Sequence, residues 1–318
     1  MFVDGDNADE MEKALKKLSD KENRSPEKDY LIGLAFFNGI GVELEKAKEE
    51  YLKAIEIDEK IDIQLKSADS AYSLSVDMLG LGDIYMKHGK YEEANRLYER
   101  ATILRKQILD GEDTDDHRNK YAEAVLSMGT SMLLCGNSEE ANFLLNTAKD
   151  ILLNLAETNG TIQAQYAYSV ALNRCAKACE EKDDFQNALN YYTDSLNRRK
   201  KILSHIRTCE AVYEYARTQF LRANSYQTIY DNATAKREYE DVVGSLKTIL
   251  SRDRNGSIHR LQAEAAFGRF KLDTFSGKQY LKYAIDVWKW LSEKQIENHK
   301  FQKEYELCQR IYQQCYPE

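Results

Sequence analysis

The sequence contains only two prolines among its 318 residues, Pro26 near the start and Pro317 near the end. Proline interrupts an α-helix because it lacks a backbone N–H and because its ring collides with the preceding turn. Runs of Val, Ile and Thr with the alternation of a β-strand are also nearly absent, whereas Ala, Leu, Glu, Lys and Gln are common. This composition predicts an all-α protein whose helices are not broken by proline between these two positions.

Membrane spans and secretion signals are also missing. No apolar run approaches the roughly 18 residues that a transmembrane helix needs. The first residues, MFVDGDNADEMEK, have neither the basic region nor the apolar core of a signal peptide. The six cysteines show no spacing typical of a disulfide framework. We therefore expect a cytoplasmic protein with reduced thiols.

Basic charge is in short supply. The chain has 53 acidic and 45 basic residues, which gives a formal net charge of −8. A protein that binds nucleic acid needs a stripe of Lys and Arg to neutralise phosphates. We therefore expect no nucleic-acid partner and no insertion into a membrane. The oligomeric state is left open.

No motif for catalysis, metal binding or cofactor binding is found. The five histidines do not form an HExxH or a Cys/His zinc pattern, and no GxSxG or phosphate-binding glycine loop is present. Cys175 and Cys179 lie one helical turn apart, a spacing that two metal ligands or a redox pair could use. The favoured interpretation is two small, buried and inert thiols. We expect no enzyme, no metal and no cofactor.

The stretch from Met78 to Ala101, MLGLGDIYMKHGKYEEANRLYERA, predicts two amphipathic helices joined by a short turn. Apolar and small residues recur every three to four positions in each half, which places them on one face of a helix. Gly82 and Ala94 let the two backbones approach closely, and tyrosines fill the space around that contact. This pattern resembles a tetratricopeptide repeat. The residues that carry the resemblance are Leu81, Gly82, Tyr85, Gly89, Tyr91, Ala94, Tyr98 and Ala101.

The alanine of the second helix recurs at a fixed interval. Successive members are 47 residues apart, namely Ala47, Ala94, Ala141, Ala188 and Ala235. A fixed period indicates a repeat architecture, and this one predicts helices of roughly 20 residues, about 30 Å long. The first unit resembles a Sel1-like repeat, a relative of the tetratricopeptide unit. That resemblance is carried by Gly33, Gly39, Gly41, Val42, Lys46, Ala47, Tyr51 and Ala54.

The resemblance implies a right-handed superhelix of paired α-helices, a tetratricopeptide-like solenoid of about six helix pairs with a C-terminal capping helix. Residues 1–24 are predicted to form a polar tail or short helix, and residues 25–294 the solenoid. Residues 295–318 are predicted to form the cap. The predicted repeats span residues 25–60, 61–111, 112–158, 159–206, 207–254 and 255–294. Arg222 lies where the fifth repeat would be expected to carry an apolar residue.

In this family the first helices of successive repeats line a concave groove that receives a peptide or partner helix. The helical phase places one set of side chains on that groove, apolar in the earlier repeats and polar in the later ones. Asn side chains can hold a peptide backbone, and Lys and Arg can bind a carboxylate. The predicted groove residues are Val76, Leu79, Asp83, Met86, Leu126, Thr130, Asn173, Arg174, Lys177, Arg217, Phe220 and Asn224.

The resemblance thus implies a non-catalytic scaffold that binds a peptide or protein segment in its groove. One alternative is a regulatory module that senses a ligand or peptide and acts on a fused or associated effector. Another is an unrecognised enzyme, which would require a polar cluster with perturbed pKa values in the groove. The polar residues could also be ordinary groove residues paired with Glu180 and Glu181. The aromatic residues Tyr213, Phe220, Tyr226, Tyr230 and Tyr239 could form a core or line a pocket.

Overall fold

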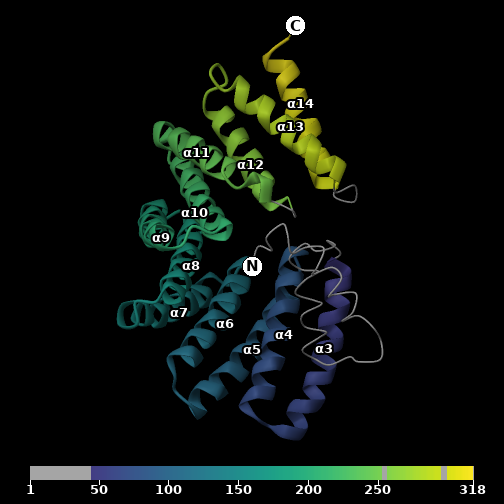
Figure 1. Ribbon diagram of the computed structural model, residues 1–318, viewed down its shortest axis with the longest axis vertical. Helices are drawn as coiled ribbons and strands as arrows, with labels where there is room; N and C mark the ends of the chain where they lie inside the picture. Colours follow the sequence, from purple (N-terminus) through teal and green to yellow (C-terminus); the bar gives the residue numbers. More distant parts are fainter. Residues whose placement is uncertain (1–43, 253–255, 295–298, 318) are drawn as a thin grey trace. The chain divides into compact units, whose positions relative to one another are not determined.

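The computed structural model describes residues 44–252, 256–294 and 299–317 (Figure 1). These residues form twelve α-helices and one short 3-10 turn, and this described part of the chain contains no strand. The all-α prediction is confirmed. The described residues divide into two compact units, one up to residue 182 and one from residue 183 on, which are described in turn.

The first unit is a series of antiparallel helices in which each helix packs against the next (Figure 1). The first helix of a pair also contacts the first helix of the following pair, since α6 contacts both α4 and α8. The helices are α3 (Leu44–Leu65), α4 (Ala68–Lys87), α5 (Tyr91–Gly111), α6 (Asp115–Leu134), α7 (Ser138–Thr158) and α8 (Ile162–Glu180).

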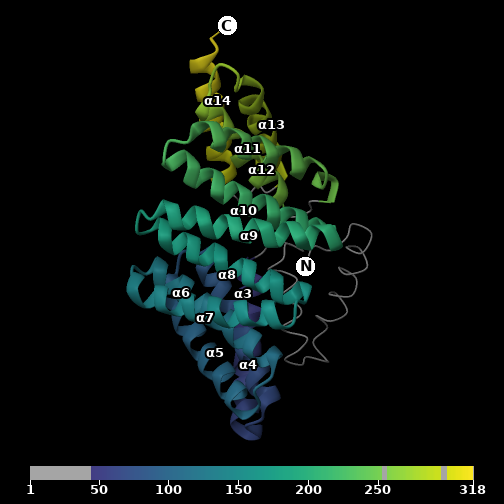
Figure 2. The same ribbon diagram turned by 90° about the vertical axis from the view of Figure 1, so that its left-hand side faces the viewer.

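The second unit continues the same pattern, and α9, α10 and α11 follow one another in Figure 2. Its last helix, α14, packs against α13, where the rings of Trp288 and Phe301 lie 5.7 Å apart. The helices are α9 (Phe185–His205), α10 (Cys209–Thr228), α11 (Asn232–Lys247), α12 (Ser257–Leu272), α13 (Lys278–Lys294) and α14 (His299–Cys315), with the 3-10 turn at Leu250–Arg252.

A hydroxyl side chain begins the first helix of four successive pairs. Each accepts a hydrogen bond from a backbone N–H three residues later, which satisfies an amide that the helix itself leaves without a partner. The four residues lie 47 positions apart and are Ser67, Thr114, Thr161 and Thr208. Local sequence therefore determines where these helices start.

The turn between the two helices of a pair requires a left-handed backbone. Gly89 and Gly136 have φ values of +71° and +88° at this position. Glycine adopts this conformation readily because it has no Cβ. At the corresponding position of later pairs, Asp183 and Tyr230 adopt it as well, with φ values of +57° and +64°. The turn geometry is thus retained even where glycine is not.

The predicted close approach between paired helices is confirmed in the first unit. Ala94 and Ala141 are completely buried, and a Cβ placed on Gly82 would lie 2.4 Å from Cε1 of Tyr98. Tyr98 is itself 1 % exposed, so its ring has no space into which to move. The absence of a side chain at Gly82 therefore allows α4 and α5 to pack around this tyrosine.

Arg222 occupies an apolar position of the repeat without leaving an uncompensated charge. Its Nη2 donates to Oε1 of Glu238 at 2.6 Å, and its Nε donates to Oε2 at 3.3 Å. Nη1 donates to the hydroxyl of Thr193 at 3.1 Å. This side chain therefore joins α9, α10 and α11 through polar contacts in place of an apolar contact.

The expected Sel1-like unit is only partly visible. Gly33, Gly39, Gly41 and Val42 lie outside the described residues, as does the predicted tail at residues 1–24. The alanines and the tyrosine of its second helix are buried in α3, at Ala47, Tyr51 and Ala54. The Sel1-like assignment of this unit remains a prediction, as do the 47-residue period and the repeat boundaries.

Candidate functional site

The second unit contains a cavity of about 700 Å³ formed by α10 to α14 and the turn after α10. Aromatic rings make up much of its wall, and amide and charged groups interrupt them. Its lining residues are Phe220, Asn224, Gln227, Thr228, Tyr230, Tyr239, Glu264, Phe267, Gly268, Lys271, Trp288 and Glu304. A concave space that combines apolar walls with a few polar groups is the usual form of a binding site.

The hydroxyl of Tyr239 organises the amide groups of the pocket. It lies 2.6 Å from Oδ1 of Asn224 and 2.8 Å from Oε1 of Gln227. One hydroxyl proton can be donated to only one of these oxygens at a time. Burial raises the pKa of Tyr239 above its ordinary value, so the proton is retained. The neutral tyrosine therefore donates to one amide oxygen at a time, and Asn224 lies at the shorter of the two distances.

Asn224 keeps two N–H donors for a ligand. Its Oδ1 is engaged by Tyr239, while its Nδ2 has no partner in the part of the chain that the structure describes. An amide fixed through its oxygen presents its two N–H groups in a defined direction. Such a group can bind a carbonyl oxygen of an extended peptide.

The aromatic wall is built around a glycine of α12. A Cβ at Gly268 would lie 2.8 Å from Cζ of Tyr239, so the absence of a side chain lets the tyrosine ring rest against α12. Phe220 tilts against Tyr239 with ring centroids 5.8 Å apart. Trp288 contributes a nearly buried ring from α13. The rings of Phe220 and Tyr239 therefore support each other in the wall.

Two carboxylates and one ammonium group line the same cavity. Glu264 pairs with Arg260 at 3.7 Å on the surface of α12. Lys271 places its Nζ 5.4 Å from the ring centroid of Phe267. Glu304 reaches the cavity from α14. The lining residues therefore carry one more acidic group than basic group.

The structure places the predicted groove residues of the second unit on α10. Phe220 and Asn224 line the cavity. Arg217 is exposed and pairs with Glu214 at 3.5 Å. Of the five aromatic residues noted in the sequence, Tyr239 is buried and also lines the cavity, whereas Tyr230 is 87 % exposed. Tyr239 therefore belongs to the hydrophobic core and also to the wall of the cavity.

In the first unit, the predicted groove residue Asp83 accepts a hydrogen bond from a buried tyrosine. The hydroxyl of Tyr98 donates to its Oδ1 at 2.6 Å. Although the residue as a whole keeps solvent-exposed surface, desolvation raises the pKa of its carboxyl, against the opposing effects of Tyr98 and Arg174. Tyr98 and Tyr239 therefore use the same device, since each buried tyrosine holds a polar side chain of the preceding helix.

The remaining predicted residues of the first unit lie on α4, α6 and α8. Val76, Leu79 and Met86 are half-buried, as are Thr130, Asn173 and Arg174, whereas Leu126 is buried. Lys177 is exposed and pairs with Glu180 at 2.7 Å, one of the two carboxylates considered as its partner. Residues of α8 and α10 belong to different units, so their convergence on one groove remains a prediction.

The predicted thiol pair has no feature of a metal or redox site. Cys175 is buried, and its Sγ donates to the carbonyl oxygen of Leu145 at 3.7 Å. Burial raises the pKa of this thiol to about 12, which keeps it protonated and unreactive. Cys179 is half-buried. Among the described residues, no group of three or more His, Cys, Asp and Glu side chains is arranged to hold a metal ion.

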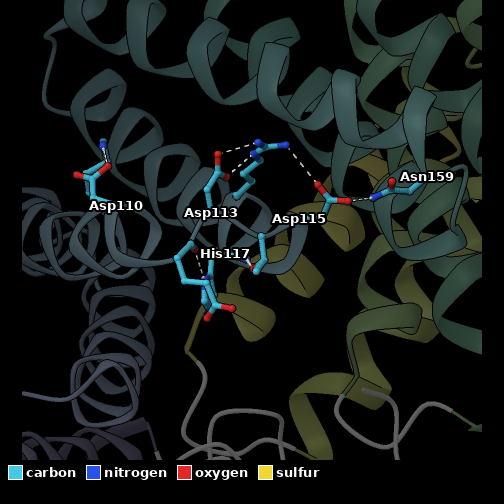
Figure 3. Close-up of polar contacts among 9 residues, drawn as sticks. Asp110, Asp113, Asp115, His117 and Asn159 are labelled. Atoms are coloured by element: carbon cyan, nitrogen blue, oxygen red, sulfur yellow. Dashed lines mark hydrogen bonds and ion pairs between the residues drawn. The ribbon is translucent and has the colours of Figure 1, made fainter.

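A second polar cluster lies in the loop between α5 and α6 (Figure 3). Arg118 donates to both carboxylate oxygens of Asp113, at 2.6 and 2.8 Å, and these bonds lower the pKa of Asp113. Asp115 accepts a hydrogen bond from Asn159 at 3.0 Å, which connects this loop to the end of α7. Because these charged groups already have partners within the protein, we interpret the cluster as a structural connection between neighbouring helix pairs.

Comparison with known proteins agrees with the geometry of the helix pairs. The tetratricopeptide repeat family matches residues 78–112, which include the end of α4, the turn and all of α5. Residues 78–112 therefore match a tetratricopeptide repeat, and the described helices share the fold of tetratricopeptide-like repeats. No curated protein matches its sequence significantly.

Solved structures similar to this chain share its fold at low sequence identity. BtubC from P. vanneervenii is 13 % identical, with a TM-score of 0.56 over 78 % of this chain and 92 % of that one. A Rap protein complexed with competence and sporulation factor is 12 % identical, with a TM-score of 0.57 over 96 % and 79 %. TPR-like repeats assigned to a kinesin light chain of Podospora anserina are 16 % identical, with a TM-score of 0.50 over 72 % and 100 %.

Several cavity residues were not among the predicted groove residues. Two of them lie at the same repeat position as a predicted residue, and are Phe267 and Lys271. The 47-residue spacing relates Phe267 to Phe220 and Lys271 to Asn224, so extending the helical phase into the last repeat would have found them. Glu304 carries no such signal, because α14 belongs to no pair.

Proposed function

We propose that this protein is a non-catalytic interaction scaffold that binds an extended segment of a partner protein or a peptide in the second-unit cavity. The observation that carries the proposal is the combination of an aromatic wall with the amide of Asn224, whose oxygen accepts a hydrogen bond from Tyr239. Aromatic pockets bury the anchor side chains that dominate the affinity of protein interfaces. The amide binds the backbone between anchors.

The fold supports this proposal. Stacked helix pairs form extended surfaces that repeat proteins use for binding. The similar Rap protein was solved in complex with competence and sporulation factor, which concerns that protein alone. Among the described residues of this chain, no helix is sufficiently long and apolar to cross a bilayer. The cytoplasmic location remains a prediction.

A site-specific photo-crosslink tests where the partner binds. Lys271 is replaced by a photo-reactive amino acid, and the protein is irradiated in native lysate. Lys289, which is exposed on α13 and pairs with Glu293, serves as the matched control position because it does not line the cavity. We expect a crosslinked peptide from one partner at position 271 only, and mass spectrometry identifies the segment. Equal crosslinking at both positions would contradict binding in the cavity.

Phe267→Ala is expected to weaken binding of the identified segment by at least about tenfold, because removal of a buried aromatic anchor commonly costs about 2 kcal/mol or more at an interface. The matched control is Phe275→Ala, since Phe275 is 95 % exposed in the loop between α12 and α13. Isothermal titration calorimetry measures both variants and the parent. If both alanine variants bind like the parent, the segment does not use the aromatic wall.

The cavity volume favours a second candidate, a module that senses a small ligand. A volume of about 700 Å³ lies within the range of small-ligand sites. Thermal-shift screening of the parent and the Phe267→Ala variant distinguishes the candidates. A small molecule that raises the melting temperature of the parent alone would favour the sensor.

A further inference from the structure

Tyr230 has a backbone conformation that an aromatic residue rarely adopts. Its φ of +64° lies in the left-handed region, where the Cβ of an L-residue comes too close to the following carbonyl oxygen. The corresponding turns of the first unit place Gly89 and Gly136 at this position. The chain thus carries a bulky ring at a turn position that holds glycine in two earlier turns and aspartate, Asp183, in a third.

The fold gains little from this ring. Tyr230 is 87 % exposed, and only its backbone participates in the turn, with its N–H donating to the carbonyl oxygen of Gln227 at 3.1 Å. Within residues 44–252, 256–294 and 299–317, its side chain forms no hydrogen bond and no ring contact. A strained residue whose side chain does not stabilise the folded state suggests a role in binding.

The position of the ring connects it to the cavity. Tyr230 follows α10 and lines the cavity together with Phe220 and Phe267. Being exposed, it lies where a bound segment would enter. An incoming group that inserts between these rings would remove the apolar surface of Tyr230 from water.

The charges of the cavity indicate which group would insert. Glu304 has no ion-pair or hydrogen-bond partner among the described residues. The faces of aromatic rings attract cations, and the Lys271 ammonium already lies over the Phe267 ring. Lys271 has no carboxylate partner among the described residues either, but its ammonium lies over the Phe267 ring, so that the Glu304 carboxylate and the other ring faces suit a cationic side chain better than an acidic one.

We propose that the cavity binds an arginine or lysine side chain of the partner segment, with Tyr230 covering the cation and Glu304 pairing with it. This specificity rests on the proposed function. It differs from the carboxylate binding that the Lys and Arg residues of the sequence had suggested. Tyr230 determines specificity through its ring face, and its hydroxyl is not required.

Synthetic peptide mixtures test the proposal without a known partner. Four heptapeptide mixtures carry Arg, Lys, Leu or Glu at the central position and are random elsewhere. Each mixture is passed over the immobilised full chain, and the retained fraction is measured. We expect the Arg and Lys mixtures to be retained at least about threefold more than the Glu mixture, because an aromatic face and a carboxylate both attract a cationic side chain.

Two pairs of variants test whether Tyr230 and Glu304 cause the preference for basic mixtures. Tyr230→Gly should abolish the preference for basic mixtures, whereas Tyr230→Phe should keep it. Glu304→Gln should reduce the preference, whereas Glu306→Gln should not, since Glu306 is exposed on the same helix outside the cavity. Tyr230→Gly should also melt at the parent temperature or about 2 °C above it, because relief of the left-handed strain offsets the loss of the side chain.

The outcomes separate this proposal from the function on which it rests. Retention of all mixtures without a basic preference would overturn only the specificity, as would a preference for the Glu mixture. A Tyr230→Gly variant that melts well below the parent would assign the ring to folding and also overturn the proposal. Failure to retain any mixture above the Phe267→Ala variant would overturn both this specificity and peptide binding in the cavity.

Discussion

Gly82→Leu is expected to lower the free energy of unfolding by about 3 kcal/mol or more. Even the first carbon of a side chain at this position would lie 2.4 Å from the ring of Tyr98. That ring is 1 % exposed and is held by its hydrogen bond to Asp83, so it cannot move without opening the contact between α4 and α5. Urea denaturation monitored by circular dichroism measures the change.

The same substitution at Gly244 provides the control. Gly244 lies within α11, and no atom is found within 4 Å of the position that a Cβ would occupy. In a helix, leucine is more favourable than glycine by roughly 0.8 kcal/mol. Gly244→Leu should therefore leave the protein as stable as the parent or slightly more stable. Equal melting of the two variants would show that Gly82 is not at a close contact.

Glu238→Leu is expected to destabilise the second unit by about 3 kcal/mol, because it leaves the Arg222 guanidinium without its bidentate partner. Both side chains are mostly removed from solvent, at 17 % and 12 % exposure. Thr193 remains as one acceptor for the arginine, but a hydroxyl does not compensate a positive charge. Thermal unfolding of the single variant measures the loss.

The double variant Arg222→Leu/Glu238→Leu should recover most of this stability. Replacing a mostly buried ion pair by apolar residues of similar volume is often neutral or stabilising, since neither charge then has to lose its water. A double variant that melts as low as Glu238→Leu would show that the contact between α10 and α11 depends on the ion pair itself.

The helix pairs could be predicted because their determinants are local. Small residues at Gly82 and Ala94 mark the close contact between two helices, and glycine marks the turn between them. Both signals are read within one pair, without knowledge of the rest of the chain. The buried alanines and the left-handed glycines are where the sequence placed them.

The cavity was less predictable because its wall combines residues from five helices. Phe220 and Asn224 were found from helical phase, but phase does not tell whether a residue lines a pocket or packs against a neighbour. Tyr230 was interpreted only as a member of an aromatic cluster, since its backbone conformation and its exposure appear only in three dimensions. Glu304 comes from a helix outside the repeats.

The ion pair of Arg222 was likewise not predictable from the sequence. From the sequence alone, where the partner of the arginine is unknown, an arginine in an apolar position indicates a degenerate repeat. Glu238 follows 16 residues later on α11, and its distance along the chain does not reveal that the two side chains meet. Polar compensation inside a helix seam therefore has to be observed in the structure.

The neighbour-to-neighbour packing within each unit also affects how the chain acquires its structure. Each described helix makes most of its contacts with the helix just before or after it, and such short-range contacts favour rapid folding. Synthesis proceeds at about 5–20 residues per second, whereas a helix forms in about a microsecond. A pair such as α4 and α5 can therefore close while the following pair is still being made, and the growing protein can exclude water from its seams in the order of translation.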